Sequence, residues 1–423
     1  MSFAQALTRR TGGQVAGAAR TALERLATRI AGEGGEPLEV ILPDGNRLGF
    51  GLPPRIRIVV RDMAVLAEFA RPSLASLAEA FVHGRVDLQG DLLEALPLVE
   101  RLVQAGGSGS GIAERVAGLF VRHTTRIDRD AIGYHYDVGN AFYRLWLDER
   151  MVYSCAYFQS GEESIDEAQR AKLDHICRKL RLVPGDRLLD VGCGWGGLVL
   201  HAVQHYGVSA VGITLSKEQH AFANERISAL GLGGRVAVEL LDYRELPERY
   251  GRATFDKAAS VGMFEHVGLR NLATYFGTVA AMLRDGGLFL NHGITATDVE
   301  NRPVGSGAGD FIGKYVFPHG ELPHLHLAVR EMSAAQFEVV DVESLRPHYV
   351  RTLALWSHRL ESQLDAAERL VGDRTLRIWR AYLAGCSHGF AQGWVSIHQL
   401  LGIVQRAPGS TGLPLTRDWM YRT

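Results

Sequence analysis

The chain has 423 residues, 46% of them hydrophobic, and a formal net charge of −1. This length favours two or three domains, and the balanced charge gives no reason to expect a nucleic-acid-binding protein. The four cysteines, Cys155, Cys177, Cys193 and Cys386, show neither a CxxC pair nor the spacing of a zinc site, which favours a reducing, cytosolic compartment and no bound metal. No apolar run approaches the roughly 18 residues of a membrane span, and the N-terminal segment lacks the apolar block of a signal peptide.

Near the N-terminus, apolar residues recur at helical spacing, namely Val15, Ala19, Leu23, Leu26 and Ile30. This periodicity predicts an amphipathic helix. We expect the helix to pack on its own domain, and the alternative is a helix that lies on a membrane surface.

The next segment, residues 37–102, predicts a small α+β domain. A hairpin is expected around Asp44-Gly45, followed by a half-buried strand in "RIRIVV", where arginine and isoleucine alternate. Residues 74–102 are expected to form a helix, a tight turn and a second helix. The Gly/Ser-rich stretch that follows, residues 105–112, predicts a linker.

Beyond the linker the pattern changes. Residues 129–153, "RDAIGYHYDVGNAFYRLWLDERMVY", are expected to form one helix with its aromatic residues distributed along it. Strands are then predicted at 186–191, 208–213, 235–241, 255–261 and 286–294, with helices at 196–207 and 216–231. Alternation of this kind predicts an α/β fold with a doubly wound, mostly parallel sheet.

A glycine-rich loop, "GCGWGG" at 192–197, lies between the first of these strands and the first helix. A GxGxxG motif is weak by itself, but the strand–turn–helix context strengthens it. A dinucleotide site would need an acidic residue about 20 positions further on, where this chain has Thr214 within "GITLS". Asp190 could instead accept an amino group, and Asp242 could receive an adenine amino group. We therefore predict S-adenosylmethionine as the cofactor, and not NAD.

Functional groups in an open parallel sheet gather where the strands end. Glu265 follows the fourth predicted strand, and His292 lies within or after the fifth. A histidine at a strand end is often only hydrogen-bonded in the core. Two such groups on adjacent strands beside one cofactor loop favour a functional role.

Several further blocks carry a resemblance to a known family. They are "YHYDVGNAFYRLWLD", "MVYSCAYF", "LLDVGCGWGG", "GITLSKEQ", "FEHVG", "FIGKYVFPHGELP", "HYVRTLALW" and "YLAGCSHGF", in this order between Tyr134 and Tyr421. The chain resembles the cyclopropane-fatty-acyl-phospholipid synthase family, which includes the mycolic acid cyclopropane synthases. The resemblance implies a Rossmann-like class I methyltransferase fold. One departure is "HLHLAV" after "FPHGELP", where relatives usually have a serine, and it puts the acyl preference in doubt.

The resemblance also implies the site residues. Those expected to bind S-adenosylmethionine are Tyr153, Ser154, Asp190, Gly192, Cys193, Gly194, Trp195, Gly196, Thr214, Leu215, Ser216, Gln219, Asp242 and Tyr243. A bicarbonate ion, the implied base, would be held by Cys155, Glu265, His292, the backbone of Ile294, and Tyr349. Plain packing is the alternative for Cys155. Cys386 matches a family cysteine once regarded as catalytic, although a thiol nucleophile has no obvious task in this chemistry.

The implied reaction adds the methyl carbon of S-adenosylmethionine to the cis double bond of unsaturated acyl chains in membrane phospholipids, and closes a cyclopropane ring through a carbocation. One alternative is a methyltransferase that forms a methylene-branched chain, and another is a lipid-binding module with a vestigial methyltransferase fold. We expect residues 1–104 to serve lipid access or association, and residues 113–423 to form the catalytic domain. The expected location is cytoplasmic, peripheral on the inner face of the membrane, with a homodimer as one option.

Overall fold

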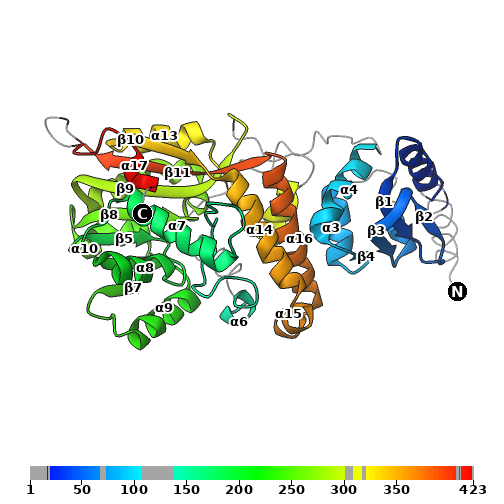
Figure 1. The fold of residues 1–423 in the computed structure, drawn as a ribbon, viewed down its shortest axis with the longest axis horizontal. Coiled ribbons are helices and arrows are strands. Elements are labelled where there is room, and N and C mark those ends of the chain that lie inside the picture. The colour runs from blue at the N-terminus through cyan, green and yellow to red at the C-terminus, as the bar shows by residue number, and fades with distance from the viewer. Residues whose placement is uncertain are drawn as a thin grey trace, which may run out of the picture. The chain divides into compact units, whose positions relative to one another are not determined.

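The computed structural model describes residue 17 and residues 20–66, 73–105, 138–300, 308–316, 321–405, 409 and 411–421. Its contacts divide the chain into two compact units (Figure 1). Unit 1 comprises Met1–Leu119, Pro303–Val316 and Leu360–His388, and unit 2 comprises the remaining segments. Among the described residues, no helix is long and apolar enough to cross a membrane. The predicted linker lies almost entirely outside the described residues.

Unit 1 is built on a small sheet in the order β2-β1-β3-β4. Its strands are β1 (Glu36–Ile41), β2 (Arg47–Gly49), β3 (Gly51–Val60) and β4 (Val86–Gln89). β1 and β2 pair antiparallel, which confirms the predicted hairpin, and Gly45 has the positive φ of +85° that its turn requires. The predicted tight turn between two helices is wrong, because β4 lies between α3 (Leu74–Val82) and α4 (Leu92–Ala105) and pairs with β3.

The N-terminal helix, described over residues 20–32, packs on this sheet. Leu23, Leu26 and Ala27 are buried in one core cluster with strand residues such as Val40 and Ile58. This burial confirms the prediction that the helix packs on its own domain. The predicted apolar positions Val15 and Ala19 lie outside the described residues.

Three helices from later in the chain complete unit 1, namely α12 (Ala308–Tyr315), α15 (Leu364–Val371) and most of α16 (Asp373–Ala391). Lys314 and the Tyr315 hydroxyl both donate to the Glu79 carboxylate, at 2.5 and 2.6 Å. Arg377 pairs with Asp87 at 2.7 Å. The compact unit therefore differs from the predicted linear division, since contacts between segments far apart in sequence leave no local pattern.

Unit 2 contains a seven-stranded sheet in the order β10-β11-β9-β8-β5-β6-β7. The strands are β5 (Arg187–Val191), β6 (Ser209–Thr214), β7 (Val236–Leu240), β8 (Phe255–Val261), β9 (Leu283–Ala296), β10 (Phe337–Ser344) and β11 (Val395–Val404). The first five are parallel, and β10 and β11 add antiparallel pairs beside β9. The predicted doubly wound, mostly parallel sheet is confirmed, and β10 and β11 are additions that the alternating pattern did not indicate.

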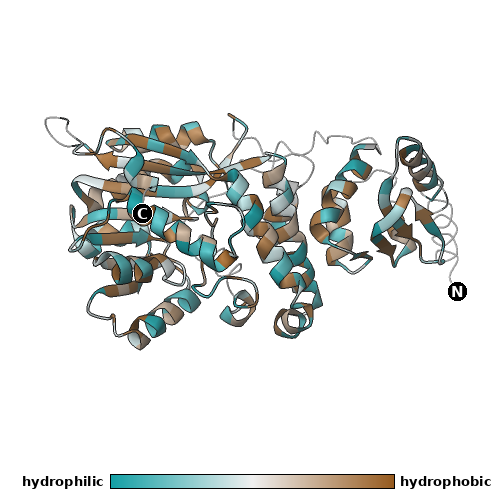
Figure 2. Ribbon diagram, in the orientation of Figure 1, coloured by the Kyte–Doolittle hydropathy of each residue, from teal (hydrophilic) through white to brown (hydrophobic). Residues whose placement is uncertain are grey.

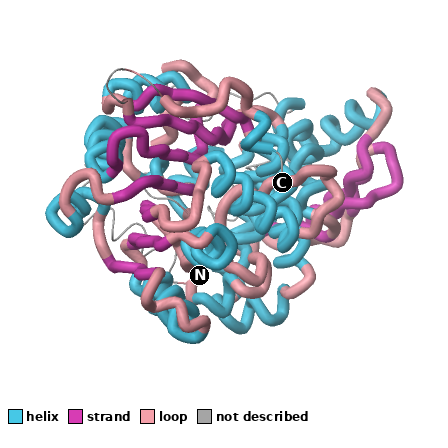
Figure 3. Tube along the Cα trace, turned by 60° about the vertical axis from the view of Figure 1, so that its left-hand side comes forward, coloured by secondary structure: helices cyan, strands magenta, loops and turns pink. Residues whose placement is uncertain are grey.

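Helices cover both faces of this sheet (Figure 3). One core cluster joins it to α7 (Ile165–Lys179), α8 (Gly197–Tyr206) and α9 (Lys217–Ala229). A second core cluster joins it to α10 (Leu246–Tyr250), α11 (Leu272–Met282) and α13 (Leu325–Ala334). α14 (Arg346–Glu361) begins just after β10, and α17 (Asp418–Tyr421) packs against α7. In Figure 2, hydrophilic colour runs along much of α7, although many of its residues are buried.

The long helix predicted for residues 129–153 is wrong over its described part, residues 138–153. Only α6 (Asn140–Tyr143) is helical there. The Asp148 carboxylate accepts backbone N–H bonds from Arg150 at 3.1 Å and Val152 at 2.7 Å, so the chain turns back on itself. Met151 takes a positive φ of 58° in this turn. Local side-chain capping of this kind competes with helix formation.

Candidate active site

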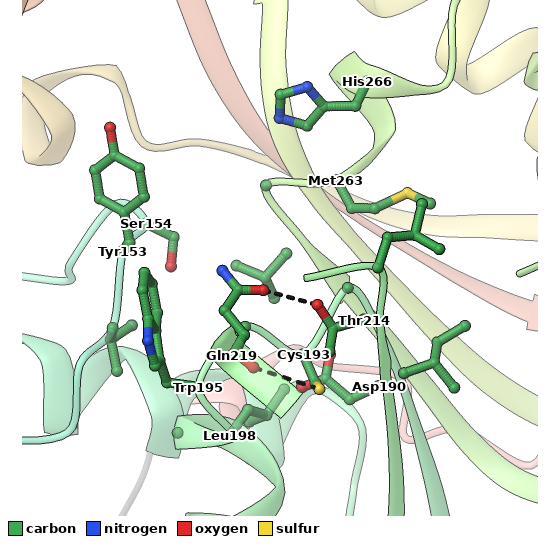
Figure 4. Close-up of a pocket in the computed structure, with 18 of the residues that line it drawn as sticks. Tyr153, Ser154, Asp190, Cys193, Trp195, Leu198, Thr214, Gln219, Met263 and His266 are labelled. Atoms are coloured by element: carbon green, nitrogen blue, oxygen red, sulfur yellow. Dashed lines mark hydrogen bonds between the residues drawn. The ribbon is translucent and has the colours of Figure 1, made fainter. Parts of the chain in front are cut away.

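A pocket opens where the strands β5, β6 and β8 end, and the loop around Tyr153 lies against it (Figure 4). Figure 4 shows Tyr153 and Trp195 on one side of this pocket and Met263 on the opposite side. The predicted cofactor-binding residues that line it are Tyr153, Ser154, Asp190, Gly192, Cys193, Gly194, Trp195, Thr214, Leu215, Gln219, Asp242 and Tyr243. Gly196 and Ser216 are not among the lining residues. The structure therefore brings most of the predicted set around one cavity.

The glycine loop turns tightly at the end of β5. The N–H groups of Gly192 and Cys193 both donate to the carbonyl of Ile213, at 3.0 and 2.9 Å, which ties the loop to β6. Gly192 has a φ of +80°, and a Cβ there would lie 2.9 Å from the Met263 side chain. Glycine is needed at this position on both grounds. Gly196 instead begins α8 with a left-handed conformation, which is a structural role.

Asp190 is one of two acidic residues that line this pocket, and Asp242 is the other. The Asp190 side chain is 2% exposed, and its Oδ1 has no hydrogen-bond partner among the described residues. Burial raises the pKa of Asp190 to about 7, while the charge of Lys172 acts in the opposite direction. A buried carboxylate oxygen without a partner is costly. A cationic donor in the pocket would satisfy it.

β6 ends at Thr214, where a dinucleotide site would require an acid, and Thr214 is hydrogen-bonded to Gln219 of α9. The Thr214 hydroxyl donates to the Gln219 side-chain oxygen at 2.7 Å, and both side chains are buried. Ser216 caps α9 by accepting from the Gln219 N–H at 3.3 Å. Ser216 therefore positions Gln219 and does not face the pocket itself.

Asp242 is held by a neighbour that the sequence reading did not single out. The Arg244 guanidinium binds both Asp242 oxygens, at 2.8 and 2.7 Å, and lies over the Tyr243 ring. Arg244 also lines the pocket. Adenine recognition by Asp242 stays a prediction, since one of its oxygens would have to accept a further hydrogen bond beside Arg244.

Glu265 lies in a short 3₁₀ turn after β8, next to His266, which lines the pocket. Its Oε1 accepts from the N–H of Ile294 at 3.4 Å, and its Oε2 has no partner among the described residues. Burial raises the pKa of Glu265 to about 7. Gly293 makes room for this turn, because a Cβ there would collide with Phe264 and lie 2.9 Å from Glu265 Oε2.

His292 and Cys155 are also buried. His292 Nδ1 accepts from the side-chain amide of Gln399 at 3.1 Å, so its hydrogen lies on Nε2, which has no partner among the described residues. Burial lowers the pKa of His292 well below its usual value, and the ring is neutral. The Cys155 thiol donates to the Ala156 carbonyl at 3.3 Å, and burial raises its pKa. Cys155 is therefore a neutral thiol and not a nucleophile.

The other two catalytic candidates lie on helices near the end of the chain. Tyr349 of α14 packs against Phe390, with ring centroids 4.7 Å apart. Cys386 lies on α16, in the segment that belongs to unit 1. Burial raises the pKa of Cys386 to about 12, so it is not a thiolate at neutral pH. The role of Cys386 stays a prediction.

Residues 123–400 match the family model "Mycolic acid cyclopropane synthetase". The chain belongs to this family. It is 50% identical over 388 residues to a probable fatty acid methyltransferase of Pseudomonas putida, which covers 91% of this chain and 96% of the relative. It is 38% identical over 269 residues to cyclopropane-fatty-acyl-phospholipid synthase of Escherichia coli (strain K12), covering 63% of this chain and 66% of that enzyme. The solved structure of mycolic acid cyclopropane synthase CmaA1 complexed with SAH and CTAB is 34% identical, with a TM-score of 0.61 over 65% of this chain and 98% of that chain.

Membership of the mycolic acid cyclopropane synthetase family confirms both the predicted resemblance and the class I methyltransferase fold. The match to the Pseudomonas putida protein extends over most of this chain, whereas the CmaA1 structure matches about two thirds of it.

Sequence reasoning missed several pocket residues of this family member, including Lys172, Arg244, Met263 and His266. For Lys172 a signal was present. Ile165, Ala168 and Ile176 form a buried stripe on α7, and Lys172 falls in that stripe at helical spacing. A lysine on the apolar face of a helix needs a buried partner. Its Nζ donates to the Ser154 hydroxyl oxygen at 2.8 Å.

Proposed function

We propose that this protein transfers the methyl carbon of S-adenosylmethionine to the cis double bond of unsaturated phospholipid acyl chains and closes a cyclopropane ring. The observation that carries the proposal is the pocket at the strand ends, with its glycine loop and the unpartnered, buried Asp190, in a chain of this family. The Escherichia coli relative is a cyclopropane-fatty-acyl-phospholipid synthase, and CmaA1 was solved with SAH.

The residues of the pocket fit this cofactor. Asp190 offers an unpartnered oxygen to the ammonium group, and Tyr153 and Ser154 border the same cavity for the methionine end. The Thr214–Gln219 pair offers polar atoms where the ribose would lie. When bound, S-adenosylmethionine supplies an activated methyl group on a positively charged sulfur.

The chain must stabilise a carbocation that develops on the lipid. A cation in a dry cavity is stabilised by fixed negative charge and aromatic faces. Glu265 is the acidic group assigned to this task, because it is buried and its Oε2 has no partner among the described residues. Tyr153, which lines the pocket, packs against the Trp356 ring with centroids 5.3 Å apart and offers an aromatic face.

We further propose that a bicarbonate ion serves as the base, held by Cys155, Glu265, His292, the backbone of Ile294, and Tyr349. The Nε2 hydrogen of His292 is buried, has no partner among the described residues and can donate to such an anion. Glu265 and bicarbonate would both be negatively charged, so donors such as His292 and the Tyr349 hydroxyl would have to lie between them. When bound, the ion would supply a weak base for a very acidic proton.

Omitting bicarbonate provides a direct test of this base. In degassed, bicarbonate-free buffer, turnover is expected to fall at least several-fold and to recover on addition of sodium bicarbonate. Sodium chloride at the same ionic strength serves as the control, and S-adenosylmethionine affinity should stay unchanged in both buffers. Full turnover without bicarbonate would contradict the proposed base.

The product distinguishes the main proposal from its alternative. The Pseudomonas putida relative, which matches 91% of this chain, is a probable fatty acid methyltransferase, so a methylene-branched product is the alternative. Loss of a proton from the new methyl closes the ring, whereas a hydride shift followed by proton loss gives the branch. The four side chains assigned to the base match the ring-forming pattern of the family, so we favour the cyclopropane.

Proton NMR of phospholipids after reaction with the purified protein settles the product. Cyclopropane ring protons are expected upfield of all other lipid signals. Vinylic branch signals without upfield ones would make the branching reaction correct, even though the two products have equal mass. Tight cofactor binding without any product would favour the lipid-binding module with a vestigial fold.

The role of the N-terminal segment remains a separate proposal. None of the described residues before 105 lines the cofactor pocket, whose lining residues all fall between 151 and 267. We propose that this segment serves lipid access or self-association at the cytoplasmic face of a membrane, as a peripheral protein that reaches its phospholipid substrate there.

A further inference from the structure

Helix α7 carries a buried lysine toward the cofactor pocket. Lys172 is 1% exposed and lines the cavity together with Ser154 and Asp190. Burial of an ammonium group costs several kcal/mol unless polar groups compensate it. Lys172 lies on a helix that contributes Leu173 and Ile176 to the core. Because its burial is costly, we expect its ammonium group to have a specific partner.

The groups around Lys172 come from three other parts of unit 2. Its charge interacts with Asp148 and Cys155 of the loop after α6, with Asp190 of β5, and with His292 of β9. Asp148 is already occupied by two backbone N–H groups. The hydrogen bond that the Lys172 ammonium makes is to Ser154 Oγ, at 2.8 Å.

This hydrogen bond fixes the direction of the Ser154 hydroxyl. A charged lysine side chain is a donor only, so the serine oxygen must accept from it. The serine O–H is then left to donate elsewhere, and Ser154 lines the pocket. A hydroxyl polarised by a neighbouring ammonium group is a stronger donor, suited to a negatively charged acceptor.

We propose that Lys172 is a positioning residue that orients and polarises the Ser154 hydroxyl toward the carboxylate of the cofactor's amino-acid group, with Asp190 receiving the ammonium group of the same zwitterion. The inference rests on the proposed S-adenosylmethionine site and assigns its recognition of the carboxylate. Lys172 acts through Ser154 and takes no part in methyl transfer.

The test compares two ligands that differ in the carboxylate alone: S-adenosylmethionine and its decarboxylated form. Isothermal titration calorimetry at pH 7 is expected to show wild-type protein binding the carboxylate-bearing ligand roughly 10- to 100-fold more tightly, the scale of one hydrogen bond to a charged group. Lys172→Met keeps the length and apolar stem of the side chain. This variant is expected to bring the two affinities within about threefold, whereas Lys172→Arg should restore much of the preference.

Gln169 provides a matched control on the same helix. Its side-chain amide donates to the carbonyls of Ser154 at 2.8 Å and Val152 at 3.2 Å, so it holds the same loop without carrying charge. Gln169→Met should weaken both ligands alike and leave their ratio unchanged. Ser154→Ala should abolish the preference, and adding Lys172→Met to it should change the ratio no further.

A measurement on the wild-type protein covers the case in which Lys172→Met fails to fold. Burial lowers the pKa of Lys172 to about 8, so its charge is lost as the pH rises through that value. The affinity for an S-adenosyl compound that keeps the carboxylate but lacks the amino group should therefore fall above pH 8. A flat profile, or a Lys172→Met variant that keeps the full preference, would overturn the inference. Failure of the wild-type protein to bind S-adenosylmethionine would instead overturn the proposed cofactor.

Discussion

Replacing Glu265 by glutamine is expected to lower turnover by roughly 10²-fold or more, the usual scale for loss of one electrostatic stabiliser. Glu265 does not line the cofactor pocket, and its Oε1 accepts only the weak bond from Ile294 at 3.4 Å. S-adenosylmethionine affinity should therefore stay within a few fold of wild type. Single-turnover kinetics on phospholipid vesicles, together with calorimetry of cofactor binding, would measure the two effects separately.

Stability against pH provides the control for this variant. Burial raises the pKa of Glu265 from 4.5 to about 7, so the folded protein binds this proton more tightly than the unfolded chain. The resulting stabilisation is complete below the ordinary pKa and is lost as the pH rises through about 7. Glutamine carries no charge at any pH. At pH 8 Glu265→Gln should thus be more stable than wild type by up to about 3 kcal/mol, and the difference should vanish near pH 4.

An unchanged turnover in Glu265→Gln would remove this residue from the mechanism. A loss of turnover together with lower stability at pH 8 would indicate a folding defect in place of a catalytic one. Glu265→Asp adds a second check, because it keeps the charge but moves it by one methylene. A cation stabiliser should tolerate that displacement poorly.

The five parallel strands of unit 2 could be predicted from sequence because each contains an apolar run with turn residues near its ends. The strand predicted at 255–261 coincides with β8 (Phe255–Val261). The predicted helix is wrong over residues 138–153 because the Asp148 carboxylate caps a turn there. Hydrophobic periodicity gives no sign of such a side-chain hydrogen bond. The assembly of α12 and α16 into unit 1 depends on pairs such as Glu79–Lys314, which are more than 200 residues apart in sequence.

In the site as well, residues close together in sequence could be predicted, whereas contacts between distant residues could not. The glycine loop and Asp190 lie within a few residues of one another, so a single motif predicts both. Lys172 lies in the buried stripe of α7, but its partner Ser154 lies in the loop before that helix, and helical periodicity does not indicate this contact. The contact of Gln399 with His292 could not be predicted from sequence. It depends on the pairing of β11 with β9, which are about 100 residues apart, and no local pattern predicts β11.

Replacing Asp190 by asparagine is expected to weaken S-adenosylmethionine binding by roughly 10²-fold at pH 7.5, the scale for loss of one partner of a buried charge pair. Asparagine keeps the shape of the side chain but offers no charge to the ammonium group. Equilibrium dialysis or calorimetry would measure the dissociation constants. NAD should bind neither protein, and tight NAD binding to wild type would contradict the cofactor assignment.

The pH dependence identifies the charge of Asp190 as the cause. With burial raising its pKa to about 7, Asp190 holds a proton over part of the acidic range. An ammonium ligand favours the ionised form, so binding must displace that proton. Wild-type affinity should therefore fall as the pH is lowered from 7.5 to 5.5, approaching tenfold per pH unit well below the pKa.

Asp190→Asn should bind weakly but with a nearly flat profile over the same range. Asp256 offers a matched control, since it is also buried but lies at the opposite end of the sheet, where it accepts from the Arg187 N–H at 2.6 Å and pairs with Arg284. Asp256→Asn should lower the melting temperature while keeping the wild-type pH profile of cofactor binding. If Asp190→Asn retained the acidic decline, the titrating group would be another residue, and the role assigned to Asp190 would be wrong.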